Sequence, residues 1–96
     1  MTKLPIYFAS ELGADTCMDL ALFFFEARRN SGLTISEAAI RSGLSIDDVD
    51  VLETQSGYYD FAKIAKLLDL YQERLPLSPH CFKRLPPRIV KKYFRV

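Results

Sequence analysis

Few residues of this chain have side chains suited to covalent or metal chemistry. His80 and Cys81 are adjacent, and His80 is the only histidine among the 96 residues. A cysteine nucleophile needs an oriented base, and adjacency in the sequence does not orient one. A metal site needs three or four converging ligands, and the spacing of Cys17, His80 and Cys81 predicts no such group. We therefore expect no catalytic, cofactor-binding or metal-binding residues, and a protein that is not an enzyme.

Binding chemistry is better represented, because the charges are divided unevenly along the chain. Residues 1–74 contain all 12 acidic residues and seven basic ones, a net charge of −5, whereas residues 75–96 contain six basic residues and no acidic one. The six are Lys83, Arg84, Arg88, Lys91, Lys92 and Arg95. A terminal block of one sign is typical of an arm that binds a polyanion or an acidic partner. The alternative is a solvated end that folds back on the acidic part of the chain.

Length and composition limit the kind of protein. A chain of 96 residues predicts one domain with a small core, far short of the roughly 250 residues of a barrel enzyme. Its 49% hydrophobic and 26% charged residues are typical of a globular protein and exclude wholesale disorder. No apolar run approaches a membrane span, and the first residues lack the features of a secretory signal. We expect a soluble, cytoplasmic protein without membrane contact.

Apolar periodicity and capping residues predict four helices in the middle of the chain. Thr34 and Glu37 have the spacing of a capping box, in which each side chain accepts from the other's backbone N–H. Ser45 and Asp60 are N-cap residues for two later helices. The helices are expected at about 15–30, 35–42, 46–54 and 61–72, with a loop at 55–59.

The two ends are punctuated by proline. Leu4, Ile6 and Phe8 alternate as in a strand, but Pro5 interrupts them, so residues 1–14 are predicted to be an arm with at most one helical turn. Four of the five prolines lie in residues 75–96. There, Ser-Pro and Pro-Pro sequences predict two short helices, at about 79–85 and 87–95. In a continuous last helix, Arg88, Lys91, Lys92 and Arg95 would share one face.

A series of short motifs occurs in order between residues 28 and 68. They are Arg28, Gly32-Leu33-Thr34, Glu37-x-Ala39-x-x-x-Gly43-Leu44-Ser45, Val49-x-x-Leu52-Glu53 and Phe61-x-Lys63-Ile64-Ala65-Lys66-x-Leu68. Their order and spacing resemble the lambda-repressor/Cro-like (xenobiotic-response-element) family of helix-turn-helix domains. The resemblance implies an all-α bundle of about five helices and a mostly buried, structural ion pair between Arg28 and Glu53. The chain then divides into an arm (1–14), a helix-turn-helix domain (15–74) and a basic, proline-punctuated helical extension (75–96).

This resemblance implies a DNA-binding transcriptional regulator, whose second short helix enters the major groove. The residues expected to contact DNA are the six basic residues of 75–96 together with Arg29, Ser36, Arg41, Ser45, Gln55, Ser56 and Tyr58. Three features depart from the family. The loop from Glu53 to Phe61 is about three residues shorter than the usual pattern. Ile35 stands where the family usually has a glutamine that contacts nucleic acid. Asp47, Asp48 and Asp50 lie on the groove-facing helix, where carboxylates oppose phosphates.

The alternative function is a protein-interaction module on a helix-turn-helix scaffold. Its acidic helix, with Asp47, Asp48 and Asp50, would bind a basic partner such as RNA polymerase, another regulator or a toxin. For either function we expect a homodimer. Phe25 and the apolar side of the last helix exceed what a body of 74 residues can cover; that side comprises Ile89, Val90, Tyr93 and Phe94.

Overall fold

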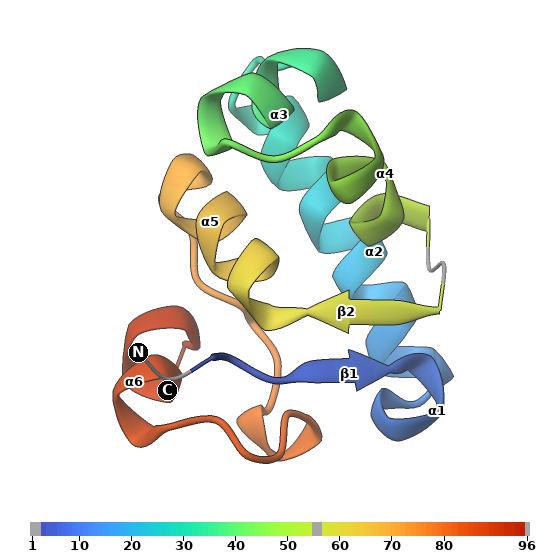
Figure 1. Ribbon diagram of the computed structural model, residues 1–96, viewed down its shortest axis with the longest axis vertical. Helices are drawn as coiled ribbons and strands as arrows, with labels where there is room; N and C mark the ends of the chain where they lie inside the picture. The colour runs from blue at the N-terminus through green and yellow to red at the C-terminus, as the bar shows by residue number, and fades with distance from the viewer. Residues whose placement is uncertain (1–2, 55–56, 96) are drawn as a thin grey trace.

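The computed structural model describes residues 3–54 and 57–95, which fold into a mainly helical globule with a two-stranded sheet. Its elements are β1 (Ile6–Phe8), α1 (Ala9–Leu12), α2 (Ala14–Asn30), α3 (Ile35–Ser42), α4 (Ile46–Thr54), β2 (Tyr58–Asp60), α5 (Phe61–Tyr71), the 3-10 helix η1 (Pro79–Cys81) and α6 (Pro87–Tyr93). In Figure 1, α3 lies at the top of the long axis, and α6 lies in the lower half. None of the helices in these ranges is long and apolar enough to cross a membrane.

The central helices begin and end within one residue of the predicted positions, because local hydrogen bonds define their ends. Thr34 Oγ1 accepts from the Glu37 backbone N–H at 3.1 Å, and the Glu37 carboxylate accepts from the Thr34 N–H at 3.0 Å. Ser45 and Asp48 form the same reciprocal pair at the start of α4. Gly43 ends α3 with φ 77°, a left-handed conformation that suits a residue without a Cβ.

The prediction of an all-α fold is wrong in one respect, because residues 6–8 and 58–60 form an antiparallel sheet. The register pairs Tyr7 with Tyr59, and both side chains are buried. Their neighbours Phe8 and Tyr58 pair on the opposite, exposed face. Pro5 does not prevent the strand, because it precedes β1, and its carbonyl accepts from the Phe61 N–H at 3.1 Å. The predicted arm therefore contributes a strand, and part of the predicted loop at 55–59 becomes the other.

The basic segment is less helical than predicted. The helix expected at 79–85 is a single 3-10 turn over Pro79–Cys81, and α6 ends at Tyr93 rather than near residue 95. Phe94 leaves the helix in an extended conformation and forms a parallel bridge with Leu75. Arg95 therefore lies beyond α6 and does not share a helical face with Arg88.

One hydrophobic core joins the predicted arm, domain and extension. Phe61, at the start of α5, is surrounded by Phe82, Tyr93 and Phe94, with ring centres 5.6, 6.2 and 5.9 Å away. Ile89 is also buried, so the chain itself covers most of the apolar side of α6. The apolar side of α6 therefore no longer supports the predicted homodimer. Phe25, the other residue on which that prediction is based, is 39% exposed.

Candidate nucleic-acid interface

The relative position of α2 and α4 is fixed by a largely buried ion pair between Arg28 and Glu53. Arg28 Nε and Nη2 donate to the two carboxylate oxygens of Glu53, each at 2.9 Å. Arg28 Nη1 also donates to the Leu33 carbonyl at 3.0 Å, which ties the turn before α3 to the same group. The hydrogen bonds to Glu53 raise the pKa of Arg28 above its usual value, against the opposing effect of burial. This two-pronged geometry orients α4 and leaves neither side chain available to a ligand.

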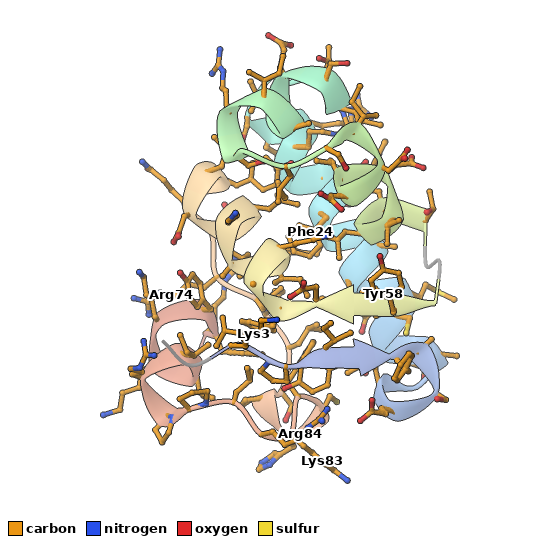
Figure 2. The ribbon with its side chains drawn as sticks, viewed as in Figure 1. Lys3, Phe24, Tyr58, Arg74, Lys83 and Arg84 are labelled. Atoms are coloured by element: carbon orange, nitrogen blue, oxygen red, sulfur yellow. The ribbon has the colours of Figure 1, made fainter. Side chains whose placement is uncertain are left out.

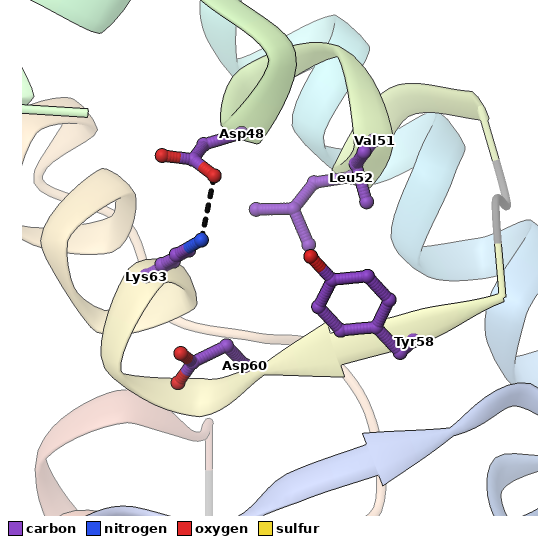
Figure 3. Close-up of a pocket in the computed structure, with 6 residues that line it drawn as sticks. All are labelled: Asp48, Val51, Leu52, Tyr58, Asp60 and Lys63. Atoms are coloured by element: carbon purple, nitrogen blue, oxygen red, sulfur yellow. Dashed lines mark hydrogen bonds and ion pairs between the residues drawn. The ribbon is translucent and has the colours of Figure 1, made fainter. Parts of the chain in front are cut away.

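The start of α4 is held against α5 by a second ion pair. Lys63 Nζ lies 2.6 Å from Asp48 Oδ1, as Figure 3 shows. Hydrogen bonds to Lys63 and to the Ser45 N–H lower the pKa of the Asp48 carboxyl, so it stays ionised. Asp48 thus has partners within the chain, whereas Asp47 and Asp50 are exposed. Of the three acidic residues predicted to meet a basic partner, Asp47 and Asp50 are the two without an ion pair among residues 3–54 and 57–95.

A small cavity lies beside this ion pair, between α4, β2 and α5 (Figure 3). Its volume is about 10 Å³, which suits a single water molecule and excludes an organic ligand. The ring of Tyr58 forms one wall, and Asp60 lies at its foot with one carboxylate oxygen capping α5. Tyr58 remains 45% exposed, so its outer face is accessible for stacking.

Most of the DNA-contacting residues predicted within the domain gather at the α3–α4 end of the molecule. Arg29 lies in the last turn of α2, Ser36 and Arg41 lie on α3, and Ser45 caps α4, all with exposed side chains. Gln55 and Ser56 lie outside the described residues. Two apolar residues at this end were not predicted as site residues: Ile40 on α3 is 80% exposed and Ile46 on α4 is 53% exposed. Their exposure could not be read from the sequence, because it depends on which helix faces pack against the core.

The predicted basic contacts of residues 75–96 fall into two groups. Arg84 pairs with Glu11 at 3.3 Å and Arg95 pairs with Glu73 at 3.0 Å, so both contribute to docking this segment on the body. The other four are exposed, and none has an ion pair within the described ranges 3–54 and 57–95. We call these four the basic surface: Lys83, Arg88, Lys91 and Lys92.

Part of the basic surface lies far from the α3–α4 end. Figure 2 shows Lys83 and Arg84 at the foot of the long axis, opposite α3, and the molecule measures 31 Å along that axis. The structure therefore separates Lys83 and Arg84 from the predicted contacts on α3. Helix α6 lies nearer to those contacts, because its Tyr93 hydroxyl bonds Asp69, which lines a shallow pocket together with Arg41. The structure does add Arg74, which precedes the Leu75–Phe94 bridge and lies beside α6. The sequence signal for Arg74 is its place at the boundary of the basic segment.

The two cysteines each contact a polar group of a neighbouring residue. Cys81 Sγ accepts from the Thr16 hydroxyl at 3.5 Å, and Cys17 lies buried with its thiol directed to the Ala9 carbonyl at 3.8 Å. No group of three or more histidine, cysteine or acidic side chains converges within the described residues 3–54 and 57–95.

Comparison with known proteins adds no functional assignment, since no protein-family model, curated protein or solved structure matches this chain.

Proposed function

We propose that this protein is a DNA-binding transcriptional regulator of the helix-turn-helix type, whose main phosphate contacts come from the basic surface. The observation that carries the proposal is the exposure of Lys83, Arg88, Lys91 and Lys92 without acidic partners in the described part of the chain. Free cations on one segment attract a polyanion, and their binding releases counterions from DNA. The Arg28–Glu53 pair between α2 and α4 supports the helix-turn-helix assignment.

The position of the cations favours contacts with the DNA backbone rather than with bases. Arg88, Lys91 and Lys92 follow one another at i, i+3 and i+4 on α6, which gives a compact group of charges. Helix α4, in contrast, contains no lysine or arginine and exposes Asp47 and Asp50. Carboxylates at this position repel phosphates. In this proposal α4 contributes little affinity, and the DNA lies along α6.

Fluorescence anisotropy with a labelled duplex, at several salt concentrations, tests the proposal. The variant with Lys83, Arg88, Lys91 and Lys92 all changed to alanine should bind more weakly to every sequence. Its salt slope should fall by about 0.9 for each phosphate that is no longer neutralised. In the matched control, Arg29 and Arg41 at the α3–α4 end are changed to alanine. This variant should bind the duplex almost as tightly as the unmodified chain does. Loss of binding only in the control would place the contacts at α3–α4, and no binding at low salt would contradict DNA binding altogether.

A second candidate function, a protein-interaction module, is favoured by the surface of the α3–α4 end. Ile40 and Ile46 expose large apolar side chains there, and Asp47 and Asp50 add negative charge. This combination matches a basic amphipathic segment of RNA polymerase, another regulator or a toxin. Titration with a basic amphipathic peptide should show binding that is lost on Ile46→Ser. The basic-surface variant should bind the peptide unchanged, which separates this function from DNA binding.

A further inference from the structure

Helix α2 has an apolar stripe that the rest of the described chain leaves uncovered. Met18, Leu22 and Phe25 are 56%, 55% and 39% exposed. Their spacing of i, i+4 and i+7 places them on one face. The opposite face of α2, with Leu20 and Phe24, is fully buried in the core. The stripe is therefore an additional surface and not a loosely packed part of the core.

Opposite charges stand at the two ends of the stripe. Asp15 lies three residues before Met18, and Arg29 lies four residues after Phe25, and both are exposed. The Arg29 guanidinium carbon is 5.6 Å from the centre of the Phe25 ring, so this cation borders the stripe directly. Leu22 is midway between Asp15 and Arg29, about 10 Å along the helix axis from each. An acidic residue therefore stands at one end of the stripe and a basic residue at the other. In an antiparallel pair of such helices, each acidic end faces the basic end of the other copy.

We infer that α2 is a docking surface for a second copy of this chain, with the two helices antiparallel about a two-fold axis at Leu22. In this arrangement Leu22 packs against its equivalent, and Met18 lies beside the partner's Phe25. Asp15 faces the partner's Arg29, and the two-fold axis repeats the pair. The inference goes beyond the proposed function, since the basic surface takes no part and Arg29 is the one residue of the α3–α4 group that does.

Two further acidic residues limit the strength of this association. Asp19 and Glu26 flank the stripe on one side. In the antiparallel pair they lie close to Asp19 and Glu26 of the second copy, and the like charges repel. A stripe of three apolar residues also buries less surface than a standard stable interface. We therefore expect a weak dimer whose population rises with protein concentration.

Sedimentation of the full chain over a range of concentrations tests the surface. The unmodified protein should shift from monomer to dimer as its concentration rises. Leu22→Glu should remain a monomer throughout, because it buries a carboxylate at the centre of the pair. Ile40→Glu is the matched control, since Ile40 is a more exposed apolar residue on α3, and it should dimerise as the unmodified chain does.

A charge exchange tests the antiparallel arrangement and the identity of the partner. Asp15→Arg places like charges opposite each other in its homodimer, and Arg29→Asp does the same. Each variant alone should associate at least about tenfold more weakly than the unmodified chain. An equimolar mixture of the two should recover dimerisation, because the introduced arginine then faces the introduced aspartate, and the native Asp15 and Arg29 face each other. Recovery in the mixture also shows that both variants are folded.

Three results would overturn the inference. They are an unmodified chain that stays monomeric at the highest concentration, a Leu22→Glu variant that dimerises normally, and a mixture of folded variants that fails to recover. The first would mean that a different protein or solvent covers the stripe. Because these measurements contain no DNA, their failure leaves the proposed function untouched.

Discussion

Leu75 and Phe94 form a parallel β-bridge that attaches the end of the chain to the segment after α5. The Leu75 N–H donates to the Tyr93 carbonyl at 2.7 Å, and the Arg95 N–H donates to the Leu75 carbonyl at 3.0 Å. Between these bonds, the Phe94 side chain is fully buried and stacks on Phe61 with 14° between the ring planes. The basic segment is thus anchored in the core by Phe94, and the bridge fixes the position of the backbone that carries its cations.

Phe94→Ala should therefore destabilise the whole protein and not only its last residues. Removal of a fully buried phenylalanine leaves a cavity and costs about 3–5 kcal/mol of unfolding free energy. Urea denaturation followed by circular dichroism measures the loss. Lys91→Ala, on the exposed side of α6, is the control and should leave the denaturation midpoint unchanged. A Phe94→Ala variant as stable as the control would show that the bridge is not part of the cooperative fold.

The Arg28–Glu53 pair should contribute far more to stability than the surface pairs do. Glu53→Ala leaves the Arg28 charge poorly solvated and without its carboxylate, and should cost about 3–5 kcal/mol. Glu73→Ala breaks the exposed pair with Arg95 and should cost less than about 1 kcal/mol. Denaturant midpoints of the two variants give the comparison. Equal midpoints would mean that water solvates Arg28 as well as it solvates Arg95.

The boundaries of α3 and α4 could be predicted from the sequence because their signals are local. The caps of Thr34 with Glu37 and of Ser45 with Asp48 each join residues three positions apart, and Gly43 ends α3 by its own backbone conformation. The strands could not be predicted in this way. Each has three residues, and Tyr7 becomes a strand residue only because Tyr59, distant in the sequence, pairs with it.

The candidate site shows the same division between local and distant information. The sequence identifies the six cations of residues 75–96, and their exposure follows from their charge. It does not reveal that Arg84 forms an ion pair with Glu11. Nor does it reveal that Phe94 is buried in an extended conformation, so that α6 ends before Arg95. It also does not reveal that Lys83 and Arg84 lie at the opposite end of the molecule from α3, because that separation depends on how the elements pack in space.

Acid should weaken the contact between α4 and α5 through Asp48. Lys63 and the Ser45 N–H lower the pKa of Asp48 below its value in the unfolded chain, so the ionised form stabilises the fold. This contribution is complete above the unfolded pKa of about 4 and is lost as the pH falls through the lower, folded value. Asp48→Asn should remove that part of the pH dependence, so its melting temperature falls less between neutral and acidic pH. Asp47→Asn, which has no ion pair within the described ranges, serves as the control. An Asp48→Asn curve parallel to that of the unmodified chain would contradict the prediction.

The stability of the protein should respond differently when the hydroxyl groups of two buried tyrosines are removed. The Tyr71 hydroxyl is buried and has no hydrogen-bond partner within residues 3–54 and 57–95. Burial, with a smaller effect from the Glu53 charge, raises its pKa to about 12, so it stays neutral. An unsatisfied buried hydroxyl costs about 1–3 kcal/mol, so Tyr71→Phe should leave stability unchanged or increase it.

Tyr93 is the matched case, because its hydroxyl donates to the Asp69 carboxylate at 3.1 Å. Tyr93→Phe loses this bond and leaves the ring in place, and should cost about 1 kcal/mol. Urea midpoints measured side by side should therefore rise or hold for Tyr71→Phe and fall for Tyr93→Phe. If Tyr71→Phe falls by as much as Tyr93→Phe, the Tyr71 hydroxyl has a partner in solution, such as an internal water molecule bound near the Arg28–Glu53 pair.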